Sequence, residues 1–260
     1  MTLRDALKTA ESRLASAGID TPRVDAELLL AHVAGTTRSG LYADLDREVD
    51  GSWEQLLERR AAREPLAYVL GEWGFRRLTL KTDPRALVPR PETEIVVERC
   101  LALLEGMQAP RVLDIGVGSG AIALALKDER PDTRVVGVDV STGALELAAE
   151  NARRLGLDVE LRPGDVEAAA EGWELVVSNP PYVETLDGLE PELQHEPQKA
   201  LLGAGFHETI ARTARTRFLV LEVGDGQAEE VASVLETAGY HDVAITRDLA
   251  GIERVVEGSR

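Results

Sequence analysis

The chain has 260 residues, of which 44% are hydrophobic and 29% charged, and its formal net charge is −17 at pH 7. This length can bury the core of one large domain or two small ones, and the composition is typical of a globular protein. The acidity argues against a general nucleic-acid binder, because phosphate contacts require a basic face. It favours a basic protein partner, although acidic residues also serve solubility alone.

The composition also predicts the cellular location. The single cysteine, Cys100, excludes an internal disulfide and a metal site built from cysteines. No apolar run approaches the roughly 18 residues of a membrane span. The first residues predict an amphipathic helix and show no signal-like apolar segment. We therefore expect a monomer in the reducing cytoplasm, with no membrane contact.

Residues 1–71 have the pattern of a small all-helical bundle. Apolar residues recur at helical spacing near the start, at Leu3, Ala6, Leu7, Ala10 and Leu14. Thr21 and Pro22 are a good N-cap and first-turn pair for a second helix, which Gly35 is expected to end. Asp50 can cap a third helix, and Gly71 is expected to end a short fourth one.

Residues 72–90 are predicted to form a β-hairpin that links two domains. Phe75, Leu78 and Leu80 alternate with polar residues, as in a half-buried strand. The pair Asp83-Pro84 is typical of a turn, and 86–88 are expected to form the returning strand.

Residues 91–260 alternate strands with helices, which predicts a doubly wound, Rossmann-like α/β sheet of seven strands. The expected strands span 111–115, 134–139, 158–162, 174–178, 217–223, 240–246 and 252–257. Helices are expected at 92–104, 119–129, 142–155 and 226–238. Continuous apolar runs such as 135–138 are typical of parallel strands that are covered on both faces.

A glycine-rich loop follows the first of these strands. It consists of Gly116, Val117, Gly118, Ser119 and Gly120. Glycines allow the backbone to approach a ligand closely, and the helix that follows offers free N–H groups to an anion. With Ala121 the loop also matches a dinucleotide-binding pattern, and Asp139, ending the next strand, suits ribose hydroxyls in either case.

Asp114, immediately before the loop, favours a different ligand. A dehydrogenase usually keeps this strand end apolar, whereas an acid suits a cationic ligand such as S-adenosylmethionine. Asp165, which follows the third strand, could accept a hydrogen bond from the adenine amino group. A solvated loop acid remains an alternative for Asp165.

The tetrapeptide Asn179-Pro180-Pro181-Tyr182 follows the fourth strand. The prolines stiffen this loop and hold the Asn179 side chain in place. The Asn179 oxygen and the Pro180 carbonyl could accept hydrogen bonds from a planar NH₂ group, and the Tyr182 ring could cover its face. Fixed acceptors would help a weakly nucleophilic nitrogen as positive charge develops on it. A surface turn is the alternative.

Other catalytic chemistry lacks candidates. The four histidines are scattered along the chain, and no nucleophile–base pair or metal site is evident. We expect no metal, because direct methyl transfer depends mainly on positioning.

Several segments together resemble the protein-(glutamine-N5) methyltransferases that modify peptide chain release factors. The resemblance spans nearly the whole chain. Besides the glycine loop, Asp139 and the Asn179 motif, it is carried by residues 23–32, 64–72, 87–94, 196–201 and 221–227. The segment 90–94 favours the release-factor branch over the relative that methylates a ribosomal protein.

The resemblance implies roles for these residues. Gly116 to Gly120, Asp139 and Val166 would contact S-adenosylmethionine, and Asn179 would lie next to both the cofactor and the substrate. Asn179, Pro180, Pro181 and Tyr182 would hold the glutamine of a Gly-Gly-Gln motif in a class 1 release factor. Asn179, Pro180 and Tyr182 would serve in catalysis, and the helical domain would dock the factor.

The chain departs from the family pattern in three places. Val117 stands where the family mostly has Thr, and Val166 stands where an aromatic residue is frequent. The segment 203–217 looks short. Two other functions remain open: an adenine-N6 methyltransferase, whose substrate amine is also planar and conjugated, and a non-catalytic binder of S-adenosylmethionine that works through its helical domain.

Overall fold

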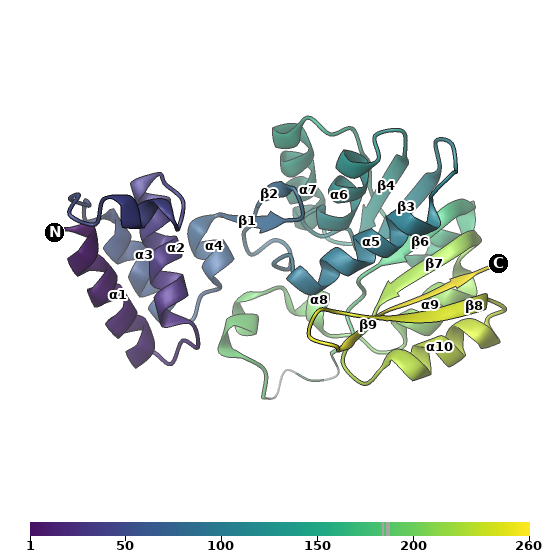
Figure 1. Cartoon of the computed structure of the whole chain (residues 1–260). Helices are drawn as coiled ribbons and strands as arrows, with labels where there is room; N and C mark the ends of the chain where they lie inside the picture. The colour runs from purple at the N-terminus through teal and green to yellow at the C-terminus, as the bar shows by residue number, and fades with distance from the viewer. Residues whose placement is uncertain (184, 186–187) are drawn as a thin grey trace. The chain divides into compact units, whose positions relative to one another are not determined.

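A computed structural model describes residues 1–183, 185 and 188–260. The chain forms two compact units, drawn in Figure 1. The first contains Met1–Glu72 and Leu189–His195, and the second contains Trp73–Gly188 and Glu196–Arg260.

The first unit is helical. Its elements are α1 (Leu3–Ser16), α2 (Pro22–Ala34), η1 (Gly40–Ala43), α3 (Ser52–Ala61), α4 (Leu66–Leu70) and η4 (Pro191–His195). The apolar positions of α1 that recur at helical spacing are all buried. Gly35 and Gly71 end α2 and α4 with φ angles of 63° and 76°, a left-handed conformation that favours glycine.

A buried ion-pair cluster connects η4 to the helices of the first unit. Arg60 contacts Asp25 at 2.7 Å and Glu192 at 2.8 Å, and Arg63 contacts Glu192 at 2.7 Å. Arg60 and Asp25 are both buried. The charges of this cluster neutralise one another, which is what allows them to be buried. No pattern in the sequence indicates that the segment after the Asn179 motif joins this unit.

The hairpin forms, but its strands are not the ones expected. β1 (Glu72–Phe75) and β2 (Leu78–Lys81) make a two-stranded sheet, and the chain turns at Arg76, whose φ is 51°. The predicted turn at Asp83-Pro84 is confirmed, since the Ala86 N–H donates to the Asp83 carbonyl at 3.3 Å. The predicted strand over 86–88 is wrong. The Val88 N–H donates to the buried Glu196 carboxylate at 2.9 Å, so side-chain contacts, and not strand pairing, hold this segment.

The predicted seven-stranded sheet is confirmed. Its strands are β3 (Arg111–Ile115), β4 (Arg134–Asp139), β5 (Glu160–Pro163), β6 (Trp173–Ser178), β7 (Thr216–Glu222), β8 (His241–Arg247) and β9 (Glu253–Ser259). They lie in the order β5-β4-β3-β6-β7-β9-β8. β3 to β7 are parallel, while β9 runs antiparallel to both β7 and β8.

Helices cover both faces of the sheet (Figure 1). They include α5 (Glu94–Leu103), α6 (Ala121–Glu129), α7 (Thr142–Leu155), α9 (Phe206–Thr213) and α10 (Ala228–Thr237), with the short segments η2 (Pro91–Thr93), η3 (Val166–Glu171) and α8 (Gln198–Leu201). Val112 packs into the core under α5 to α7, whereas Leu113 packs into the core under α9 and α10. This alternation is the ordinary period of a strand that is buried on both faces.

Strand order reverses between β3 and β6, so the chain leaves these two strands toward opposite faces. Open α/β sheets bind their ligands at the carboxyl ends of the strands beside such a reversal. The glycine loop follows β3 and the Asn179 motif follows β6, so the fold brings the two sequence motifs to this edge. None of the described helices is long and apolar enough to cross a bilayer.

Gly137 in β4 leaves space for the glycine loop. A β-carbon at this position would come within 2.6 Å of Val117 Cγ2 and 3.0 Å of Leu161 Cδ2. Overpacking of a buried site typically costs about 1–3 kcal/mol. We expect Gly137→Ala to lower the free energy of unfolding by about that amount in a urea titration.

Gly74→Ala is the matched control for this prediction. Gly74 also lies in a strand, but a β-carbon there would meet no atom within 4 Å. Its free energy of unfolding should change by less than about 0.5 kcal/mol. Equal losses in the two variants would show that crowding at Val117 is not the cause.

Candidate cofactor and substrate site

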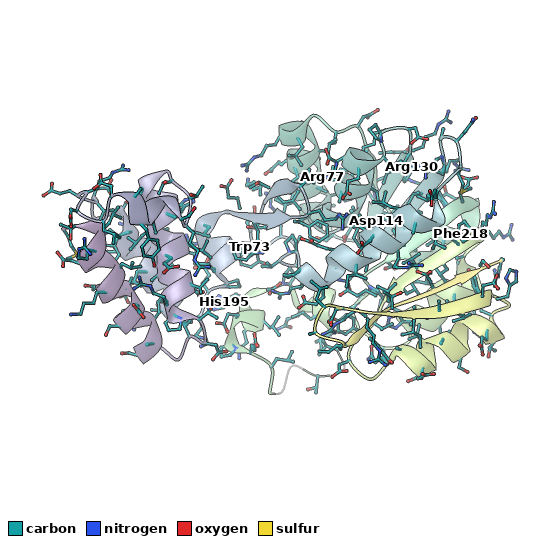
Figure 2. All side chains as sticks on the ribbon, in the orientation of Figure 1. Trp73, Arg77, Asp114, Arg130, His195 and Phe218 are labelled. Atoms are coloured by element: carbon teal, nitrogen blue, oxygen red, sulfur yellow. The ribbon has the colours of Figure 1, made fainter. Side chains whose placement is uncertain are left out.

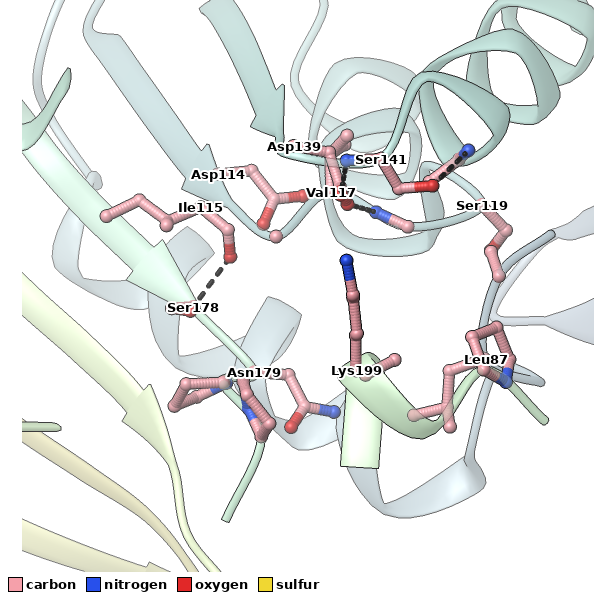
Figure 3. A pocket seen from close by; sticks show the side chains of 18 of the residues that line it. Leu87, Asp114, Ile115, Val117, Ser119, Asp139, Ser141, Ser178, Asn179 and Lys199 are labelled. Carbon is pink, nitrogen blue, oxygen red and sulfur yellow. Dashed lines mark hydrogen bonds between the residues drawn. The ribbon is translucent and has the colours of Figure 1, made fainter. Parts of the chain in front are cut away.

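A cavity of about 540 Å³ lies at the carboxyl ends of β3, β4 and β6. Figure 3 shows its lining residues. This volume falls within the usual range for small-molecule sites. The residues predicted from the sequence that line it are Gly116, Val117, Gly118, Ser119, Asp139, Asp165, Asn179, Pro180 and Pro181.

The glycine loop adopts a conformation that requires glycine. Gly116, Gly118 and Gly120 have φ angles of 73°, 56° and 90°. The Gly118 N–H donates to Asp139 Oδ2 at 3.0 Å, and the Ser141 N–H donates to Asp139 Oδ1 at 2.8 Å. Asp139 therefore ties the loop after β3 to the loop after β4, and its carboxylate lies on the cavity wall (Figure 3).

Asp114 lies in β3, which leads into the same loop, and it is buried inside the second unit (Figure 2). Its Oδ2 accepts a hydrogen bond from the Ala123 N–H at 3.1 Å, whereas its buried Oδ1 has no partner. Burial raises the pKa of Asp114 to about 8, against the lowering effect of the Ala123 bond. The sequence predicts a cationic ligand beside this acid; in the structure Asp114 lines the cavity, and its Oδ1 is buried without a partner.

The Asn179 motif forms the opposite wall. Ser178 ends β6 and donates its hydroxyl to the Ile115 carbonyl at 2.8 Å, which ties the end of β6 to β3. The Asn179 Nδ2 donates to Thr93 Oγ1 at 3.4 Å, and Pro180 and Pro181 line the cavity. An amide that donates through Nδ2 keeps its Oδ1 available as an acceptor.

Three other predicted site residues are placed differently. Gly120 is the N-cap of α6 and is not in the cavity wall. Tyr182 also lies outside the wall and is half-buried, with its carbonyl accepting a hydrogen bond from Gln227 Nε2 at 3.2 Å. Val166 is buried in the core under η3, and its N–H donates to Asp165 Oδ1 at 2.8 Å. The ligand contacts expected of these residues stay predictions.

The cavity also contains residues that sequence reasoning did not select as ligands. The segment 85–90 forms part of the wall, and Arg90 pairs with the buried Glu196. Lys199 of α8 points its ammonium group toward the glycine loop and Asp139 (Figure 3). Among the described residues, no ion pair involves Lys199. The family-like segment 196–201 was the available signal for it.

Within residues 1–183, 185 and 188–260, no group of three His, Cys, Asp or Glu side chains is placed to hold a metal ion. The arrangement described here instead offers backbone N–H groups, carboxylates and one ammonium to a charged organic ligand, next to a fixed amide oxygen.

Comparison with known proteins identifies both parts of the chain. Residues 5–71 match the family model described as PrmC N-terminal domain, and residues 95–222 match the Methyltransferase small domain. Among solved structures, the catalytic domain of hMettl16 is 14% identical and has a TM-score of 0.58, covering 78% of this chain and 82% of its own. A methyltransferase from Pyrococcus furiosus has a TM-score of 0.50 at 18% identity, covering 69% and 87%. These two similarities show the fold alone.

Curated relatives align along the whole chain. The release factor glutamine methyltransferase of Deinococcus radiodurans is 41% identical, covering 100% of this chain and 99% of its own. The protein of the same name from Caulobacter vibrioides is 38% identical, covering 99% and 96%. The resemblance stated from the sequence is confirmed: the chain is a methyltransferase that belongs to the release factor glutamine methyltransferase family.

Proposed function

We propose that this protein transfers a methyl group from S-adenosylmethionine to the side-chain amide nitrogen of the glutamine in the Gly-Gly-Gln motif of class 1 peptide chain release factors. One observation carries the proposal. The glycine loop with Asp139 and the Asn179 amide line the same cavity. A methyl donor on the first wall would therefore lie next to an amide held by the second.

The donor set fits S-adenosylmethionine. Its ribose hydroxyls suit Asp139, and its two cationic centres suit acids such as the unpartnered oxygen of Asp114. The ammonium of Lys199 and the N–H groups of the glycine loop would take its carboxylate. Asp165, which follows β5, would accept a hydrogen bond from the adenine amino group. Val166 would lie behind the adenine. When bound, S-adenosylmethionine supplies an electrophilic methyl group.

The substrate amide must be made more reactive. Its nitrogen is a poor nucleophile because its lone pair is delocalised. Asn179 Oδ1 and the Pro180 carbonyl would accept its N–H bonds, which stabilises the positive charge that develops on nitrogen. Two prolines fix these acceptors before the substrate arrives, so positioning contributes a large part of the rate. Tyr182 would cover one face of the amide.

The remaining assignments follow from charge and domain order. We infer that the helical domain, residues 1–71, docks the release factor, that 72–90 link it to the methyltransferase domain of 91–260, and that the enzyme is a cytoplasmic monomer without direct nucleic-acid contacts. The net charge of −17 supports a basic protein partner over a nucleic acid.

Cofactor affinity should depend on the ionisation of Asp114. Its pKa is raised to about 8 by burial, so the free enzyme holds a proton there at neutral pH. A cationic ligand favours the carboxylate, so binding releases this proton, and affinity should rise with pH until about 8. Between pH 6.5 and 8.5 we expect roughly a 25-fold gain in affinity.

Asp114→Asn is the matched control, because the amide can still accept the Ala123 bond but does not ionise. Calorimetric titration of both proteins with S-adenosylmethionine isolates the contribution of Asp114 from that of the ligand's own amine. The same pH dependence in both proteins would contradict the assignment.

The proposed reaction is tested with purified protein, S-adenosylmethionine labelled on its methyl group and a class 1 release factor. The same factor with its Gly-Gly-Gln glutamine replaced is the control. We expect label to enter only the unaltered factor. Label in both factors, or label in duplex DNA but in neither factor, would overturn the proposed substrate.

A further inference from the structure

The hydroxyl of Thr93 is used in an unusual way. Thr93 ends η2 and directly precedes α5, and its backbone is helical (φ −66°, ψ −18°), so its side chain does not cap α5. Its Oγ1 instead accepts from Asn179 Nδ2 at 3.4 Å, and the same hydroxyl lies close to the Glu222 carboxyl group. Thr93 is 5% exposed and lines the cavity.

Glu222 is a buried acid to which the reaction described above assigns no part. It ends β7 and is 2% exposed. Its Oε2 has no hydrogen-bond partner, and no ion pair of Glu222 occurs in the part of the chain that the structure describes. Burial raises its pKa to about 7, while the nearby Thr93 hydroxyl acts to lower it. Burying an acid without a counter-charge costs stability, so this position calls for an explanation.

Strand pairing brings the three residues together. β6 and β7 are parallel neighbours in which Ser178 is opposite Leu221. The next residue of each strand is Asn179 on one and Glu222 on the other. Thr93 ends η2, and its side chain accepts from Asn179 and lies close to Glu222. The arrangement therefore belongs to the rigid edge of the sheet.

The order of donors and acceptors has a consequence for Asn179. A carboxyl group keeps an oxygen that accepts whether or not it is protonated, so Thr93 can donate its single hydroxyl proton to Glu222. Its oxygen can then only accept from Asn179. The amide must present its NH₂ to Thr93 and its Oδ1 to the cavity. Without Glu222, Thr93 could donate to Oδ1, and the amide could turn its NH₂ toward the substrate.

We propose that Glu222, acting through Thr93, is a positioning residue that fixes the side-chain amide of Asn179 with its oxygen toward the substrate. The proposal rests on the proposed function. The orientation of the Asn179 amide matters because the substrate amide donates N–H groups and therefore needs an acceptor. The wrong orientation would set two NH₂ groups against each other. The fixed orientation removes that state before the substrate binds.

The test measures kcat and KM of the native enzyme and its variants on a release factor. Thr93→Val and Glu222→Leu should each lower kcat roughly ten- to a hundredfold, because displacing a catalytic contact reduces the rate by about this factor. KM for S-adenosylmethionine should stay close to the native value. Thr93→Ser, which keeps the hydroxyl, should recover most of the kcat lost in Thr93→Val.

Thr133→Val is the matched control for an isosteric change at a buried threonine. Thr133 is 0% exposed, its hydroxyl has no partner, and it precedes β4 at the edge of the sheet away from the cavity. This variant should keep the native kcat. Thermal unfolding of every variant checks folding, and Glu222→Leu should unfold no more readily than the native protein, because it removes an unpaired buried acid.

Combination with Asn179→Ala separates positioning from general stability. If Glu222 and Thr93 act through Asn179, their replacement should cost nothing further in an Asn179→Ala background. Losses that multiply in the double variants, or single variants with kcat within twofold of native, would overturn the proposal. An inactive native enzyme in the same assay would instead refute the proposed function.

Discussion

Asn179→Ala should lower the turnover number roughly 10²–10³-fold, the loss typical of one oriented polar contact to the reacting group. The alanine removes the only side-chain acceptor that the Asn179 motif offers to the substrate amide. Steady-state kinetics with saturating release factor and S-adenosylmethionine measure the effect. The loss should fall mainly on turnover, because the contact strengthens as charge develops on the nitrogen.

Gln108→Ala is the control for this loss. Gln108 is an exposed amide that precedes β3, at the edge of the sheet opposite the cavity. Its replacement removes the same chemical group and should leave turnover unchanged. A turnover number of native size in Asn179→Ala would remove Asn179 from the mechanism and with it the proposed role of the tetrapeptide.

Asp139→Ala should weaken the binding of S-adenosylmethionine about ten- to a hundredfold, since hydrogen bonds to a charged group contribute about 1.5–3 kcal/mol. Two effects combine in this variant. The carboxylate would bind the ribose hydroxyls, and it also holds the N–H groups of Gly118 and Ser141 at 3.0 and 2.8 Å. Its removal therefore takes away a ligand contact and loosens the glycine loop.

Asp132→Ala is the matched control for this prediction. Asp132 also accepts a backbone N–H across a loop, from Ala109 at 3.0 Å, but it precedes β4. Calorimetric titration should show native affinity in Asp132→Ala. Native affinity in Asp139→Ala as well would show that the cofactor does not use this carboxylate.

Local patterns were sufficient to predict most of the fold. The alternation of apolar strands with amphipathic helices predicted each strand of the large sheet to within a few residues. Left-handed glycines such as Gly35 and Gly71 marked the helix ends, because few other residues adopt that backbone conformation. The antiparallel insertion of β9 between β7 and β8 depends on packing across the sheet, for which the sequence has no local signal.

The errors have a common physical origin. The apolar pattern of residues 86–88 resembles a strand, but these residues are held by the Glu196 carboxylate, more than a hundred positions away. The segment containing Glu192 joins the helical unit through Arg60 and Arg63 for the same reason. Contacts made by charged side chains with groups far away in the sequence decide both cases, and no periodicity reports them.

The residues that line the cavity were selected in part from the sequence. The glycine loop, Asp139 and Asn179 were selected because their chemistry is unusual at strand ends. Sequence cannot orient side chains, so it did not show that Tyr182 and Val166 lie outside the cavity wall, and their ligand contacts stay predictions. Thr93 and Glu222 were visible only as parts of longer family-like segments. Their arrangement depends on the pairing of β6 with β7.

The central claim is that the methyl group goes to a glutamine side-chain nitrogen in a release factor. Its most direct test is tandem mass spectrometry of a class 1 release factor after incubation with this enzyme and deuterium-labelled S-adenosylmethionine. The account predicts one labelled methyl group on the side-chain amide of the Gly-Gly-Gln glutamine. Label on any other residue, or an unmodified factor with cofactor binding intact, would contradict it.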